Sequence, residues 1–167
     1  MAASIHAASF SEMDAEQRVY GAILQTRSPE TAPAIADRAD CDPQTARKYL
    51  NWFTDLGIVT THDGHPITYQ RNEAYFEWRR ISTLASNNTF DELRVRLREL
   101  TEKVEAFQER YDTDTPETVD AFEASSDDRP IDTVYGELAE WETARTERQR
   151  IERARRYQQA ASDVLGR

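Results

Sequence analysis

The side chains best suited to ligand recognition follow Asp42, on a segment whose apolar residues repeat with the period of a helix. At about 100° per residue, Ala46, Leu50 and Phe53 share one face of this segment, so the opposite side faces solvent. That side and its flank carry Gln44, Thr45, Arg47, Lys48 and Asn51, which we call the polar face. Amide side chains pair with adenine edges, and cationic side chains pair with guanine edges or phosphates. We interpret the polar face as a nucleic-acid contact set on a helix over residues 43–56.

A series of capped helices is predicted to position this face. The first helix begins at Ser11, after a loose tail over residues 1–10. Ser28 and Asp42 are each followed by proline, which suits the first turn of a helix, so they predict the starts of a second and a third helix. Gly57 ends the third helix. The residues predicted to face inward are Ala32, Ile35, Ala36 and Ala39 on the second helix and Ala46, Tyr49, Leu50 and Phe53 on the third.

A β-hairpin is predicted to follow the third helix. Over residues 58–69 the pattern becomes strand-like, and Asp63-Gly64 is typical of a two-residue type I′ turn. Helix resumes near Asn72. This order predicts a mainly α protein that opens with a winged helix-turn-helix domain, which is a three-helix core with a β-hairpin wing. A solvated surface is the alternative for the polar face, but within this fold we interpret it as reading the major groove of double-stranded DNA.

Several strings in the chain carry a resemblance to known regulators. The string TAPAIADRADCDPQTARKYLNWFTDLGIV resembles archaeal MarR-, ArsR- and TrmB-like proteins. More closely, TARKYL, RNEAYFEWRR, DELRVRLREL and YGELAEWETAR resemble a haloarchaeal family of winged helix-turn-helix proteins, over about residues 11–160. The resemblance implies sequence-specific binding of double-stranded DNA by a transcription regulator. It implies no cofactor and no effector.

The predicted wing is poor in cations. Winged regulators often insert an arginine or lysine from the hairpin tip into the minor groove, but this tip carries His62 and His65, and the nearest arginine is Arg71 at its base. We consider these three residues as candidates for wing or phosphate contacts. His62, Asp63 and His65 could also be interpreted as metal ligands, but a hydrated hairpin tip is the more common arrangement, so we predict no metal site.

The second half of the chain predicts long paired helices. Thr89 and Glu92 form a capping box that opens the first of them. Its apolar residues alternate at spacings of three and four and predict a coiled-coil seam: Phe90, Leu93, Leu97, Leu100, Val104, Phe107 and Tyr111. A second helix from Ile131 carries Leu138 and Trp141 on its apolar face. The two helices can pair within one chain, with a second protomer, or both.

The predicted domain boundaries follow from these elements. Residues 11–88 form the winged domain, and residues 89–167 form a helical coiled-coil dimerisation region. An acidic connection over about residues 112–130 joins the long helices and contains a short helix opened by Thr115-Pro116.

Charge is unevenly distributed along the second half. Residues 99–142 hold fifteen acidic and three basic residues, net −12, whereas residues 143–167 hold three acidic and seven basic residues, net +4. One hypothesis is that Arg153, Arg155 and Arg156 add phosphate contacts. The alternative is that these arginines pair with carboxylates on their own or the facing helix.

The whole chain of 167 residues is acidic, with 31 acidic and 21 basic residues and a net charge of −10. Lys48 and Lys103 are the only lysines. This balance indicates a halophilic archaeon with a salt-rich cytoplasm, or else an ordinary acidic protein from a GC-rich genome. Because salt screens charges beyond a few ångströms, the acidity does not exclude a nucleic-acid partner.

Several function classes are excluded or disfavoured by what the sequence lacks. It has no apolar run of membrane-spanning length and no signal peptide, so we expect a cytoplasmic protein without membrane contact. A single cysteine, Cys41, excludes a disulfide framework and any multi-cysteine metal site. Cys41 invites a redox-sensor hypothesis, but its place in the turn before Asp42 favours a packed core residue. No catalytic constellation can be assembled, so we expect neither enzyme activity nor a cofactor.

Two function classes remain. The favoured interpretation is a homodimeric transcription regulator whose coiled-coil half spaces two recognition helices for half-sites about one DNA turn apart. The alternative is a protein-interaction adaptor, or an anti-repressor that mimics DNA with the carboxylates of its acidic helical hairpin. The sequence discloses no effector, operator or sign of regulation.

Overall fold

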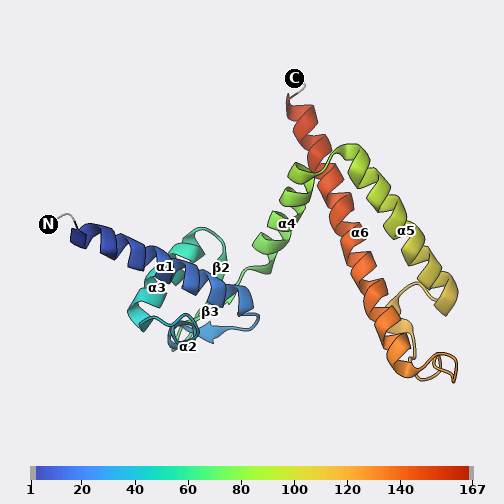
Figure 1. Ribbon diagram of the computed structural model, residues 1–167, viewed down its shortest axis with the longest axis horizontal. Helices are drawn as coiled ribbons and strands as arrows, with labels where there is room; N and C mark the ends of the chain where they lie inside the picture. Colours follow the sequence, from blue (N-terminus) through green and yellow to red (C-terminus); the bar gives the residue numbers. More distant parts are fainter. Residues whose placement is uncertain (1–2, 166–167) are drawn as a thin grey trace. The chain divides into compact units, whose positions relative to one another are not determined.

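The computed structural model describes residues 3–165, and its side chains from Asp14 to Val164. The protein is mainly helical and carries one small antiparallel sheet (Figure 1). The chain divides after Glu77 into two compact units, which are described separately below.

The first unit combines three helices with a three-stranded sheet. The sheet has the strand order β1-β3-β2, so β3 is central and pairs antiparallel with both neighbours. In chain order the elements are α1 (Ala3–Gln25), β1 (Glu30–Thr31), α2 (Ala32–Arg38), α3 (Pro43–Asp55), β2 (Val59–His62) and β3 (Thr68–Arg71).

The core of this unit lies where α1, α2 and α3 meet. All eight residues predicted to face inward on α2 and α3 are buried, and Ile35, Ala46 and Leu50 are wholly inaccessible. Val19 and Ile23 of α1 join them in the same cluster. The predicted limits of α3 are also confirmed, because Asp42 caps it and Gly57 follows it with a φ of 75°. That left-handed conformation suits glycine, which has no Cβ to clash.

The starts of the first two helices differ from the predictions. Helix α1 begins at Ala3, so Ser11 is not its first residue and residues 3–10 are helical instead of a loose tail. This stretch is rich in alanine, which has the highest helix propensity and needs no apolar period. Helix α2 is capped by Thr31, whose hydroxyl accepts a hydrogen bond from the Ala34 amide. The cap predicted at Ser28 is wrong, since the next residues form β1.

The loop that connects the two strands of the β-hairpin is longer than predicted. His62 pairs with Thr68, so five residues connect β2 and β3, and the two-residue turn at Asp63-Gly64 is wrong. The observed register places Val59 opposite Arg71 and next to Tyr69 on one face, and all three are buried. The predicted turn would pair His62 with His65, a shift of three residues that puts Val59 and Tyr69 on opposite faces. Burial of the apolar face therefore sets the register.

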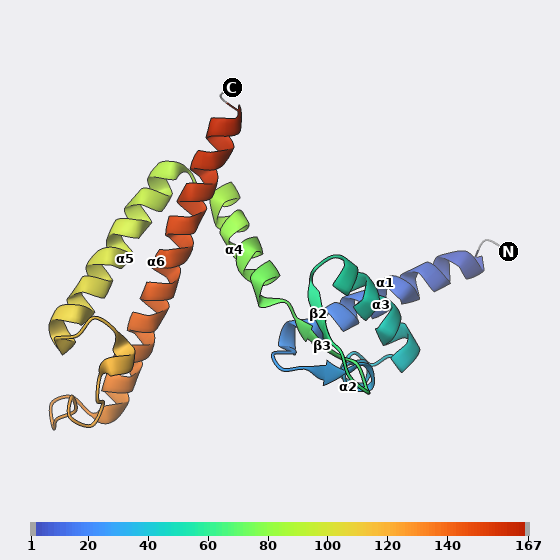
Figure 2. The same cartoon turned by 180° about the vertical axis from the view of Figure 1, so that it is seen from behind.

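The second unit is a helical hairpin with a third helix packed at one end. Helix α4 (Glu73–Asn87) crosses from the first unit into the second. It is followed by α5 (Phe90–Tyr111), a single turn of 3₁₀ helix η1 (Pro116–Thr118), and α6 (Ile131–Leu165). Helices α5 and α6 lie side by side in both views (Figures 1 and 2). The capping box predicted at Thr89 and Glu92 is present.

The predicted seam is buried within one chain. Leu93, Leu100, Val104 and Phe107 of α5 form a cluster with Trp141 of α6, and Leu97, Tyr111 and Leu138 pack against it. Ion pairs that run in opposite directions along the two helices show that they are antiparallel: Arg96 with Glu147, Lys103 with Glu140, and Arg110 with Glu137. Phe90 is the exception to the predicted seam. Its side chain is 39% exposed, because Arg155 of α6 lies over its ring instead of an apolar residue.

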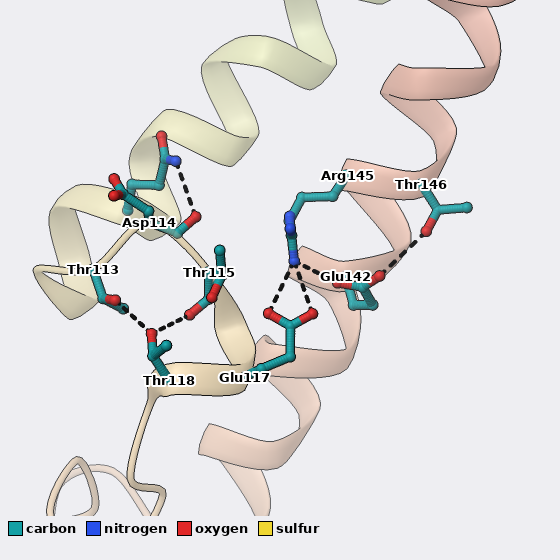
Figure 3. A network of polar contacts seen from close by, with 9 residues as sticks. Thr113, Asp114, Thr115, Glu117, Thr118, Glu142, Arg145 and Thr146 are labelled. Atoms are coloured by element: carbon teal, nitrogen blue, oxygen red, sulfur yellow. Dashed lines mark hydrogen bonds and ion pairs between the residues drawn. The ribbon is translucent and has the colours of Figure 1, made fainter.

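The acidic connection between α5 and α6 is tied to α6 by one arginine. Arg145 Nη1 lies 3.0 Å from Glu117 Oε1 and 2.8 Å from Glu142 Oε2 (Figure 3). Pro116 and Ala121 of the connection are buried. The short helix predicted at Thr115-Pro116 is present as η1, whose Thr118 hydroxyl donates to the Thr115 carbonyl.

Truncation of Leu50 tests the core that orients α3. We expect Leu50→Ala to lower the free energy of unfolding by about 2–5 kcal/mol, because it leaves a cavity at a fully buried position. Urea unfolding followed by circular dichroism measures the change. The adjacent exposed variant Asn51→Ala is the control, and its change should stay within about 0.5 kcal/mol. Equal losses in the two variants would contradict the observed rotation of α3.

Candidate nucleic-acid interface

The polar face of α3 is presented to solvent. Gln44, Arg47, Lys48 and Asn51 are exposed, while Thr45 is half-buried. Lys48 Nζ lies 5.3 Å from the centre of the Tyr49 ring. The same helix buries Ala46, Tyr49, Leu50 and Phe53, so its two faces are separated along their whole length. The structure therefore brings four of the five predicted contact residues together on an accessible surface.

The N-terminus of α3 is closed by its own residues. Asp42 Oδ1 accepts hydrogen bonds from the amides of Gln44 at 3.0 Å and Thr45 at 2.9 Å. The Thr45 hydroxyl donates to Asp42 Oδ2 at 2.5 Å. These hydrogen bonds, led by the one from the Thr45 hydroxyl, lower the pKa of Asp42. Because a carboxylate already occupies the place where a helix N-terminus binds a phosphate, contacts to a ligand fall to side chains further along α3. Thr45 is thus part of the cap.

Trp52 extends the polar face and was missed by the sequence analysis. Its side chain is 46% exposed, and its ring stacks on Phe53 with centroids 5.9 Å apart. It lies one turn after Lys48 at the edge of the polar face. A large exposed aromatic ring in such a place can pack on a thymine methyl group or a sugar. Its four-residue spacing from Lys48 is the signal that could have identified it.

The turn before α3 is held by a residue that the sequence analysis also missed. Arg18 of α1 donates from Nε to the carbonyl of Ala39 at 2.8 Å and from Nη2 to that of Asp40 at 3.3 Å. Asp40 has a φ of 50°, which ends α2, and the Cys41 amide returns to the Ala36 carbonyl. Arg18 and this backbone geometry fix the direction in which the chain enters α3.

Cys41 in this turn is a poor candidate for a redox sensor. Its side chain is half-buried and packs against the core of the first unit. Burial raises the pKa of the Cys41 thiol, and the carboxylates of Asp42 and Asp40 raise it further, against an opposing effect of Arg18. A raised pKa reduces the reactive thiolate fraction.

The hairpin residues have different roles from one another. His62 and His65 are exposed, and His62 Nε2 lies 3.1 Å from Gln70 Oε1. Arg71 is only 8% exposed, and its Nη1 donates to the Leu24 carbonyl at 2.8 Å. Its Nε also lies 2.7 Å from Glu73 Oε1. The wing or phosphate contact predicted for Arg71 is therefore wrong, because its guanidinium joins α1 to the start of α4.

The arginines of α6 divide into paired and exposed groups. Arg145 is paired with carboxylates, and the guanidinium of Arg155 lies 4.6 Å from the centre of the Phe90 ring. Arg153 and Arg156 are exposed. A phosphate contact by these two exposed arginines stays a prediction.

In the part of the chain that the structure describes, no three histidine, cysteine or carboxylate side chains lie close enough together to hold a metal ion. None of the described helices combines the length and the apolar character that crossing a membrane requires.

The fold and this surface define a mainly helical protein that exposes one polar helix face beside a small antiparallel sheet. A family model described as "Family of unknown function (DUF7342)" matches residues 13–159. The chain belongs to this family. The comparisons with curated proteins and with solved structures found no match.

The cap of α3 gives a prediction for acid stability. Because the folded pKa of Asp42 is lower than the unfolded value, the unfolded chain takes up this proton first as the pH falls. The contribution is present at neutral pH and is lost below about pH 4. Asp42→Asn keeps an N-cap side chain but removes the titration. We expect urea unfolding at pH 6 and pH 3 to show a smaller acid loss in Asp42→Asn than in the wild type. Identical acid losses would contradict this role of Asp42.

Proposed function

We propose that the protein is a winged helix-turn-helix transcription regulator that binds double-stranded DNA through α3. The observation that carries this proposal is the exposed polar face, with Arg47 and Lys48 between the amides of Gln44 and Asn51. The element order of the first unit and the resemblance to winged regulators support it. In this proposal α3 lies in the major groove, and β2 and β3 form the wing.

The distribution of cations indicates how the proposed complex would form. Arg47 and Lys48 are the two cationic residues of α3, and the hairpin tip adds histidines only. The candidate wing arginine, Arg71, is buried. Removal of Arg47 and Lys48 should therefore affect binding more than any change in the hairpin. The net charge of −10 opposes the binding of DNA only weakly, because charges beyond a Debye length of about 8 Å are screened at physiological salt.

Binding to selected DNA tests the proposed function. Purified protein would select fragments from the source genome at the salt concentration of the cytoplasm, and an enriched fragment would be labelled for fluorescence anisotropy. We expect Arg47→Ala/Lys48→Ala to weaken binding at least about tenfold, since each good base contact contributes about 1–3 kcal/mol. Arg98→Ala/Lys103→Ala on α5 removes the same charge and should leave binding nearly unchanged. Failure to enrich any fragment, or equal losses in both double variants, would contradict the proposal.

Salt dependence separates phosphate contacts from base contacts at the same two positions. The slope of log affinity against log salt should be shallower by about one for each lost phosphate contact. Titrations of the wild type and of the single variants Arg47→Ala and Lys48→Ala over a range of salt concentrations measure it. We expect at least one of the two substitutions to reduce the slope. Unchanged slopes in both, with lower affinity, would instead assign both residues to base edges.

A second candidate function is supported by the acidic connection. Phe122 is 75% exposed there, and Asp120 Oδ1 accepts hydrogen bonds from the amides of Phe122 and Glu123. An aromatic ring presented among carboxylates suits an adaptor that binds a basic protein surface, or an anti-repressor that mimics DNA. This candidate predicts that no duplex is enriched in the selection, and that the carboxylates, not α3, carry the interaction.

The proposed regulator is a homodimer, and the helical hairpin of α5 and α6 restricts how the dimer can form. The seam of α5 is covered by α6 of the same chain, so those residues are not available to a second protomer. We propose that their spacing of three and four residues supports coiled-coil packing within the hairpin. A dimer must therefore use another surface of the chain.

A further inference from the structure

Helix α6 continues beyond the residues that anchor it. Gln158 Nε2 donates to the carbonyls of Ala85 and Asn88 at 2.8 Å each, which fixes α6 at the end of α4. Beyond this point every side chain over residues 159–164 is exposed. Figures 1 and 2 both show these red turns passing the start of α5. The described chain thus leaves a stretch of helix open to solvent on all sides.

This open stretch carries an apolar stripe. Tyr157, Ala160, Ala161 and Val164 follow at the i, i+3, i+4 and i+7 positions, which share one helix face. The side chain of Tyr157 is 48% exposed and that of Val164 is 77% exposed. A groove of about 470 Å³ meets the stripe at Ala161 alone, and its other lining residues are Phe90, Gln158, Gln159, Ser162 and Asp163. Apolar residues in this pattern are usually covered by another helix.

We propose that this stripe is the contact surface for a second copy of the chain, crossed antiparallel by the same stretch of its α6. The inference deepens the homodimer of the proposed function, but it rests on α6 alone and does not depend on DNA binding. A two-fold contact must be complementary to itself, and the stripe meets this condition. Its residues are symmetric about the midpoint between Ala160 and Ala161.

The symmetry matches large residues with small ones. Two antiparallel copies that cross at this midpoint place Tyr157 of each on Val164 of the other. The alanines meet at the crossing point, where small side chains allow the two backbones to approach closely. The Tyr157 and Val164 pairs then cover apolar surface on both sides of the crossing.

Charge complementarity also favours a second copy. Arg156 and Asp163 both lie on the same flank of the stripe, seven residues apart. Two turns separate them, about 10.5 Å along the axis, so they do not meet within one helix. In antiparallel helices the same flanks face each other, so Arg156 of each copy lies on the flank of Asp163 of the other, offset from it by two residues, or about 3 Å along the axis, which an arginine side chain can span. The contact therefore gains two ion pairs, which fix its direction more than they strengthen it.

Sedimentation equilibrium of the full chain without DNA tests the proposal. We expect the wild type to shift from the mass of one chain to that of two as concentration rises. Ala161→Arg should raise the dissociation constant at least about tenfold, because it places a cation at the apolar crossing. Gln159→Arg adds the same charge on the opposite side of the exposed helix and should leave dimerisation unchanged. Unchanged circular dichroism would show that both variants stay folded.

A charge exchange tests the direction of the contact. Arg156→Asp and Asp163→Arg should each weaken the dimer several-fold, whereas the double variant should restore it, because the two ion pairs form again in reverse. A wild type that stays monomeric at all concentrations would overturn the proposal. So would a dimer that is insensitive to Ala161→Arg, or a double variant as weak as the sum of its single changes. None of these results depends on whether α3 binds DNA.

Discussion

Burial of one face of α3 is the constraint on which the rest of the account depends. Ala46, Leu50 and Phe53 can leave water only if α3 turns them toward α1 and α2. That rotation sends Gln44, Lys48 and Asn51 outward, whatever their later role. The polar face is therefore a consequence of core packing, and its direction is as stable as the core itself. Arg18 and the Asp42 cap add the second requirement, since they set where α3 begins.

Burial of apolar side chains also determines the helical hairpin of α5 and α6. Its apolar residues on α5 cannot stay exposed, and α6 of the same chain covers them around Trp141. In this arrangement the seam is covered within one chain. Helix α6 continues past the residues that cover it, so the side chains over residues 159–164 are exposed. The surface that we propose for a second copy is thus one that the α5–α6 hairpin leaves exposed.

The starts of α3 and α5 were predictable from the sequence, whereas the caps predicted at Ser11 and Ser28 did not place the starts of α1 and α2. Asp42-Pro43 and the Thr89 capping box placed the starts of α3 and α5 correctly, because local hydrogen bonds decide them. The hairpin turn was not predictable from Asp63-Gly64, since burial of Val59 and Tyr69, distant from the tip, sets the register. Strand β1 was missed because two residues carry no period, and only their pairing with β3 defines them.

The candidate site shows the same division between local and distant causes. The exposure of Arg47, Lys48 and Asn51 followed from helical spacing and was predicted. The burial of Arg71 depends on Leu24 and Glu73, and only the folded chain brings Leu24 close. Thr45 was assigned to the interface because its position on the helix is right, but its hydroxyl is taken by the neighbouring cap. Sequence patterns place a residue on a face and do not reveal its competing partners.

The most direct test of sequence-specific DNA binding is a genome-wide map of the DNA sites that the protein occupies in living cells. Cross-linking and immunoprecipitation of the tagged protein in the source organism, at its native cytoplasmic salt, would provide it. Sequence-specific binding through α3 predicts discrete peaks that share a short sequence motif. Recovery of DNA spread evenly over the genome, with the tagged protein present at normal levels, would contradict it.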